Sequence, residues 1–128
     1  MNIEVSTGEV LDKLSILDVK LRMIKDETKR QNVLNERLSL LDAVYADQSV
    51  LEWMGAHSPL LRRLFVVNRS LWNIEERLRE KEAVGRFDDE FVQLARQVYT
   101  LNDERAAIKK DINIQTQSRL IEEKEYHA

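Results

Sequence analysis

The chain has 128 residues, the length of one typical domain with a modest core. Three glycines and one proline are too few for the turns of an all-β sandwich, and 43% apolar with 34% charged residues is a helical composition rather than a disordered one. The net charge of −3, with no basic excess in either half of the chain, argues against a nucleic-acid partner, and the lack of cysteine excludes disulfides and thiolate metal sites.

The first part of the chain predicts two helices. Ser6 and Glu9 form a capping box in front of an apolar pattern with steps of four and three residues, which predicts a helix over about 7–25. The pattern resumes after the polar stretch KDETKRQN and predicts a second helix over about 28–46. We expect the segment 47–58 to be a loop, in which Trp53 and Met54 form a lid over one end of the molecule.

The second part predicts two longer helices. Ser58 as the N-cap and Pro59 at the first helical position begin a helix over about 58–84, and Gly85 follows its end. Three acidic residues begin the next helix, over about 88–115, in which Arg105 takes one of the regularly spaced apolar positions. The tail 116–128 is charged, and we expect it to be loosely held.

These elements predict an all-α fold, a four-helix bundle that forms a single helical domain over residues 1–128. The helices 58–84 and 88–115 are joined by a short loop and should form a long antiparallel hairpin. Their apolar residues have the spacing of a coiled coil, which favours a homo-oligomer, with a dimer as the first expectation.

Searches for catalytic motifs find none. The chain has no phosphate-binding loop, dinucleotide fingerprint or nucleophile elbow, and its two histidines lack the spacing of a di-iron bundle. We therefore predict no catalytic residue, metal site or cofactor, although the sequence leaves open whether the chain is an enzyme. The N-terminus has no secretory signal, and no stretch approaches the roughly 18 apolar residues of a membrane span, so we expect a cytoplasmic protein.

A polar stripe accompanies the apolar face of three predicted helices. Its members are candidates for either of two structures, a buried network that fixes helix register or a pocket for an anionic ligand. They are Lys13, Lys20, Asn68, Trp72, Glu75, Arg79, Tyr99, Asn102, Arg105, Lys109 and Asn113. In the pocket interpretation, Lys20, Arg105 and Lys109 bind the anion, and Trp72 or Tyr99 forms a wall.

Glu75 carries the most specific expectation. It lies beside the apolar face of its helix, and an unpaired buried charge costs several kcal/mol. We therefore predict that Glu75 is largely buried and contacts at least one cation from the stripe: Lys13, Lys20, Arg105 or Lys109.

Four strings in the sequence resemble an uncharacterised family of small bacterial all-helical proteins, whose members occur alone or beside glycosyltransferase-like and surface-polysaccharide genes: GEVLDKLSILDVKL (8–21), VNRSLWNIEERLREKE (67–82), FDDEFVQLARQVYTLNDERAAIKKDIN (87–113) and EEKEY (122–126). Residues 26–58 carry none of the resemblance. It implies that several stripe residues belong to a polar signature of the family, and it adds Glu9, Asp12, Arg96, Asp103, Glu122, Lys124 and Tyr126 to them.

Two functions follow as expectations. The absence of a nucleophile, metal or phosphate motif favours a non-catalytic accessory or scaffold protein of the cytoplasm that acts through protein contacts, and the resemblance implies a link to surface-polysaccharide enzymes. The alternative is a binding protein or enzyme for an anionic metabolite, such as a sugar phosphate or nucleotide sugar, held in a polar pocket between the helices 7–25, 58–84 and 88–115.

Overall fold

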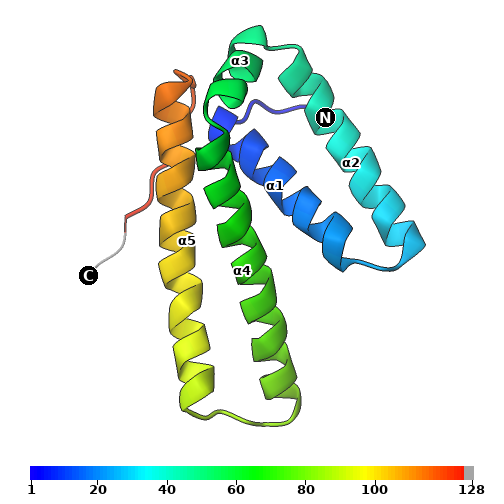
Figure 1. Ribbon diagram of the computed structural model, residues 1–128, viewed down its shortest axis with the longest axis vertical. Coiled ribbons are helices and arrows are strands. Elements are labelled where there is room, and N and C mark those ends of the chain that lie inside the picture. Colours follow the sequence, from blue (N-terminus) through cyan, green and yellow to red (C-terminus); the bar gives the residue numbers. More distant parts are fainter. Residues whose placement is uncertain (126–128) are drawn as a thin grey trace.

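The computed structural model describes residues 1–125, and over this range it is helical, without strands (Figure 1). The helices are α1 (Thr7–Met23), α2 (Glu27–Tyr45), α3 (Gln48–Ala56), α4 (Ser58–Ala83) and α5 (Asp89–Gln115). The all-α class is therefore confirmed, but residues 1–125 form five helices in place of the four predicted. No helix in the described range is long and apolar enough to cross a membrane.

The additional helix, α3, lies in the segment expected to be a loop. Asp47 caps it by accepting a hydrogen bond from the backbone N–H of Val50 at 3.3 Å. Trp53 and Met54 pack against the core, and the Trp53 indole donates to Gln115 at the end of α5. With nine residues, α3 is too short to show a clear helical period, and Gly55 within it suggests a turn.

The chain folds as two helical hairpins that pack side by side, α1–α2 and α4–α5 (Figure 1). Between α4 and α5, Gly85 has a positive φ of 66° and the Arg86 N–H bonds the Lys81 carbonyl, as in a Schellman C-cap. At the other end of α4, His57 is the N-cap and Ser58 is already helical. The expected N-cap at Ser58 is thus wrong by one residue.

Helix α1 lies at the centre of the molecule, where it contacts α2, α4 and α5. Its buried residues occupy more than one face of the helix. Beside the expected apolar face lies a face of small and polar residues. The buried residues of both faces are Gly8, Leu11, Asp12, Leu14, Ser15, Leu17 and Val19. Because α1 extends along only part of the α4–α5 hairpin, the far end of the hairpin is a pair of helices without a third (Figure 1).

The tail after α5 is held against the helices, contrary to the expectation of a loose tail. Ser118 accepts a hydrogen bond from the backbone N–H of Thr7 at 3.1 Å, and Arg119 pairs with Glu4. Lys124 pairs with Asp103 at 2.9 Å. Tyr126 and His127, which belong to the same predicted tail, lie outside the described residues.

Candidate functional site

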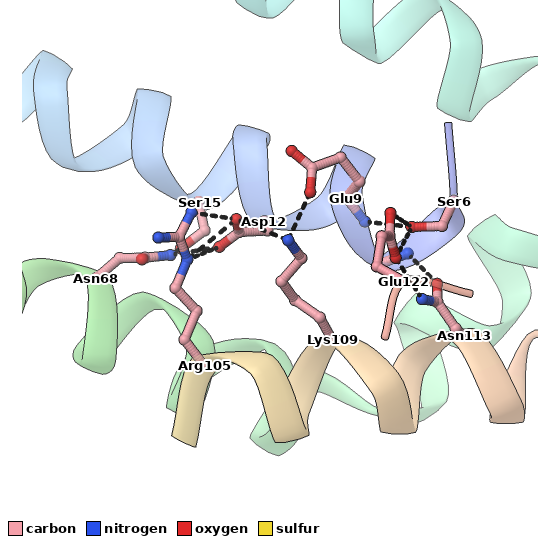
Figure 2. Close-up of polar contacts among 10 residues, drawn as sticks. Ser6, Glu9, Asp12, Ser15, Asn68, Arg105, Lys109, Asn113 and Glu122 are labelled. Carbon is pink, nitrogen blue, oxygen red and sulfur yellow. Dashed lines mark hydrogen bonds and ion pairs between the residues drawn. The ribbon is translucent and has the colours of Figure 1, made fainter. Parts of the chain in front are cut away.

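Asp12 is the buried centre of a polar cluster where α1 meets α4 and α5 (Figure 2). Its side chain is 0% exposed. Arg105 of α5 binds it through two nitrogens, Nε at 2.9 Å from Oδ1 and Nη2 at 2.5 Å from Oδ2. Asn68 of α4 donates its amide to Asp12 Oδ1 at 3.0 Å and to Ser15 Oγ at 3.1 Å. The carboxylate therefore joins three helices through charge-assisted hydrogen bonds.

The cluster continues along α1 and α5 toward the N-terminus of α1 (Figure 2). Lys109 pairs with Glu9 at 2.5 Å and lies 3.8 Å from Asp12. One turn further on, Asn113 accepts a hydrogen bond from the backbone N–H of Gly8 at 2.6 Å. This close approach needs a residue without a side chain, because a Cβ on Gly8 would lie 2.5 Å from the Lys109 carbonyl oxygen.

Glu122 of the tail closes this end of the cluster. Ser6, which is 0% exposed, donates its hydroxyl to Glu122 at 2.6 Å, and Asn113 donates its amide at 3.1 Å. Ser6 also caps α1, since it accepts the backbone N–H of Glu9. The tail thus ties the start of α1 to the end of α5.

Two groups of the cluster have perturbed pKa values. Hydrogen bonds to Asp12 raise the pKa of the Arg105 guanidinium, against the smaller effect of its burial. For Glu122, burial alone would raise the pKa of the carboxyl, but the hydrogen bonds from Ser6 and Asn113, with a contribution from Lys109, together lower it from the ordinary 4.5. Both shifts favour the charged forms that hold the cluster together.

Glu122 gives the cluster a pH dependence. A carboxyl whose folded pKa is lowered stabilises the fold above its unfolded pKa, and this stabilisation is lost as the pH falls through the folded pKa. We expect Glu122→Gln to lower the free energy of unfolding by about 1 kcal/mol or less at pH 7, because the group is exposed on one side. The difference from wild type should shrink in acid, and urea unfolding between pH 7 and pH 3 measures it.

The matched control is Glu125→Gln, in the same tail. Within residues 1–125, Glu125 makes no ion pair or hydrogen bond through its side chain, so its replacement should leave stability unchanged at every pH. Equal pH profiles for the two variants would contradict the role of Glu122.

A cavity of about 550 Å³ lies beside the cluster, between α1, α4 and α5. Ile16, Val19 and Leu71 give it an apolar wall, and the polar residues that line it are Lys20, Asn68, Trp72, Glu75, Glu76, Arg79, Asn102 and Arg105. Arg105 belongs to both structures, since it lines the cavity while its Nε and Nη2 hold Asp12.

Four polar groups at the cavity have no partner within the described range 1–125, and one of them is the carboxylate of Glu76. Lys20 makes no ion pair, and the side-chain amide of Asn102 makes no hydrogen bond. The Trp72 indole N–H is buried without an acceptor, which costs about 1–3 kcal/mol. Neighbouring atoms cover this N–H, so an acceptor reaches it only after a side chain at the rim shifts.

The structure divides the predicted polar stripe into a network and a cavity. Asn68, Arg105, Lys109 and Asn113 belong to the buried network. Lys20, Trp72, Glu75, Arg79 and Asn102, together with Asn68 and Arg105, line the cavity. Lys13 and Tyr99 are exposed and belong to neither.

The prediction for Glu75 is wrong. Its side chain is 53% exposed, and the cation it contacts is Arg79 on the next turn of α4, at 3.7 Å, rather than one from another helix. Glu75 lines the cavity, and its half-exposed side chain reaches solvent there. The cations expected to bind it have other positions: Arg105 and Lys109 hold the carboxylates of α1.

Asp12 is the buried acidic partner of Arg105. The spacing of apolar residues does not predict this role, and only the family resemblance includes Asp12. The signal was present, because Gly8, Asp12, Ser15 and Val19 follow each other at steps of four, three and four, as residues on one helix face do. A face of small and polar residues indicates close helix packing rather than solvent exposure. Ser6 and Glu122 form the other missed contact, for which a separation of 116 residues gives no local signal.

In the part of the chain that the structure describes, no group of three or more His, Asp or Glu side chains is arranged to hold a metal ion. No curated protein matches the chain, and no solved structure does. A family model, described as a family of unknown function (DUF6165), matches residues 1–128. Since the match extends over the whole sequence that carries the Asp12 cluster and the cavity, the chain belongs to this family.

Proposed function

We propose that this protein binds a small anionic metabolite with sugar-like hydroxyl groups, a sugar phosphate or nucleotide sugar, in the cavity between α1, α4 and α5. The observation that carries the proposal is a set of groups, unpartnered within the described chain, that line the cavity from three helices: the Lys20 ammonium of α1, the buried Trp72 N–H of α4 and the Asn102 amide of α5. Among the other charged groups that line the cavity, Glu75, Arg79 and Arg105 have partners, whereas Glu76 has none within residues 1–125.

The lining has the chemistry that such a ligand requires. Lys20 supplies a cation for a phosphate or carboxylate, and Trp72 supplies an aromatic surface for a sugar or base. Glu76 at the rim has no ion-pair partner within residues 1–125 and can accept hydrogen bonds from hydroxyl groups. A mixed apolar and polar cavity of this size is typical of small-molecule sites.

Lys20→Gln tests the proposal. In a Trp53→Phe background, Trp72 is the only tryptophan, so its fluorescence reports on the cavity. We expect the parent to bind a member of a panel of sugar phosphates and nucleotide sugars, with about 2.7 kcal/mol of stabilisation at 100 times the Kd in a thermal-shift assay. Loss of the charge-assisted contact in Lys20→Gln should weaken binding about 10–100-fold.

Lys13→Gln is the matched control, because Lys13 lies two turns earlier on the same helix, is exposed and does not line the cavity. It should bind as the parent does. Neutral sugars should bind weakly in every variant. A flat thermal and fluorescence response to the whole panel would overturn the proposal.

The second candidate is a non-catalytic scaffold of the cytoplasm that acts through contacts with surface-polysaccharide enzymes. It is favoured by the completeness of the Asp12 cluster, whose carboxylates and cations satisfy one another as structural groups do. Recovery of such an enzyme in a pull-down, together with a flat ligand panel, would support this candidate over the first.

A further inference from the structure

Helix α2 has two apolar stripes, and the rest of the described chain covers the second only in part. Val33 and Val44 are buried and belong to the stripe that packs on the rest of the molecule. The second stripe, which we call the outer stripe, consists of Leu34, Leu38, Leu41 and Tyr45. Leu38 and Tyr45 are 60% and 65% exposed. Helix α2 lies at the edge of the molecule, on the far side of α1 from α4 and α5 (Figure 1). Leu41 is partly buried against the core, whereas Leu34, Leu38 and Tyr45 are exposed within the described chain.

The outer stripe has the spacing of a coiled-coil seam. Its residues follow at steps of four, three and four, which puts Leu38 and Tyr45 at heptad position a and Leu34 and Leu41 at position d. The apolar residues of α4 and α5, from which self-association was expected, pack largely within the chain, with Leu64, Val67, Ile108 and Ile112 buried. On α2, by contrast, Leu34, Leu38 and Tyr45 of the seam are exposed.

The charges beside the stripe favour a second copy in parallel orientation. Arg37 takes position g and Asp42 position e, and in a parallel coiled coil position g faces the e position five residues later on the other helix. Two-fold symmetry would then form two Arg37–Asp42 pairs between the copies. In the antiparallel arrangement that places Leu38 opposite Leu41, Asp42 faces Asn35 and Arg37 faces Val44, so neither charge is paired.

Both charged groups are available for this contact. Within residues 1–125, Asp42 makes no ion pair. Arg37 donates only its Nε to Asp18, at 2.9 Å, so its two terminal nitrogens remain free to donate to a second carboxylate.

We propose that the outer stripe of α2 is the contact surface of a parallel, two-fold symmetric dimer of this chain. Apolar contact between the a and d residues supplies the attraction, and the paired Arg37 and Asp42 fix the orientation. The surface lies on the opposite side of α1 from the cavity, so the dimer leaves both cavities open.

Sedimentation over a range of concentrations tests the proposal with Leu38→Glu and a control, Val66→Glu. Both residues are exposed, at 60% and 55%, so both variants should fold, as circular dichroism can verify. We expect wild type and Val66→Glu to dimerise with the same Kd, and Leu38→Glu to raise the Kd at least tenfold. The proposal would be overturned if the wild-type chain did not self-associate at high concentration. It would also be overturned if the chain bound a different protein and no second copy of itself.

Disulfide crosslinking tests the orientation, because the chain has no cysteine of its own. Position a meets position a across a parallel dimer, so Leu38→Cys alone should form a crosslinked dimer under mild oxidation. Glu36→Cys, on the exposed side of α2 away from the stripe, should not crosslink. A crosslink that appears only when Leu38→Cys and Leu41→Cys chains are mixed would show the antiparallel arrangement and overturn the proposal.

Discussion

Asp12→Ala is expected to lower the free energy of unfolding by about 3 kcal/mol, measured by urea denaturation at pH 7. The substitution removes the acceptor of the bidentate Arg105 contact and of the Asn68 amide, and both donors are then left at the junction of three helices. Arg105 is 27% exposed and can turn partly toward water, which sets the estimate at the lower end of the range for broken buried pairs.

Asp18→Ala is the matched control on the same helix. Asp18 pairs with Arg37 at 2.9 Å, but its side chain is 43% exposed, so its loss should cost less than about 1 kcal/mol. The double variant Asp12→Ala/Arg105→Ala should recover part of the loss, because no unpaired cation remains buried. Equal costs for Asp12→Ala and Asp18→Ala would contradict a structural role for the buried pair.

Gly8→Ala is the second substitution with a large expected effect. It should destabilise the protein, although helix propensity alone would predict that alanine stabilises it. Alanine favours a helix over glycine by about 1 kcal/mol, but here the new methyl group would meet the Lys109 carbonyl oxygen at 2.5 Å and the Asn113 side chain at 2.9 Å. Forcing α1 away from α5 should cost about 1–3 kcal/mol and disturb the Gly8–Asn113 hydrogen bond.

Gly55→Ala provides the contrast for this prediction. Gly55 lies in helix α3, and a Cβ there would meet nothing within 4 Å. Alanine should therefore stabilise the protein by about 0.5–1 kcal/mol. Thermal unfolding of both variants gives the comparison, and a stabilised Gly8→Ala protein would mean that α1 and α5 are less closely packed than the structure has them.

Local signals predicted most of the fold. The four expected helices begin and end within two residues of α1, α2, α4 and α5, because capping residues and the 4-3 apolar period are properties of neighbouring residues. Helix α3 was missed, since nine residues with a glycine near the end do not distinguish a short helix from a loop. The docking of the tail was missed because it rests on contacts such as Arg119–Glu4, which join opposite ends of the chain.

For the candidate site, the sequence predicted most of the residues but not the contacts between them. Spacing identified which polar residues lie beside the apolar faces, and most of them do line the network or the cavity. It could not pair them, because the partner of each depends on how the helices cross and where α1 ends along α4. Arg105 binds Asp12 instead of Glu75 for this reason, since Asp12 is opposite it on α1 while Glu75 lies at the open rim.

The contacts of the cluster also order the assembly of the molecule. Each hairpin joins neighbours in sequence, whereas Arg105 reaches Asp12 across 93 residues and Ser6 reaches Glu122 across 116. Closing such long loops has a larger entropic cost than closing either hairpin, so we expect these contacts to form after the hairpins. The cavity has walls from both hairpins, so it requires α1 to be docked on α4 and α5.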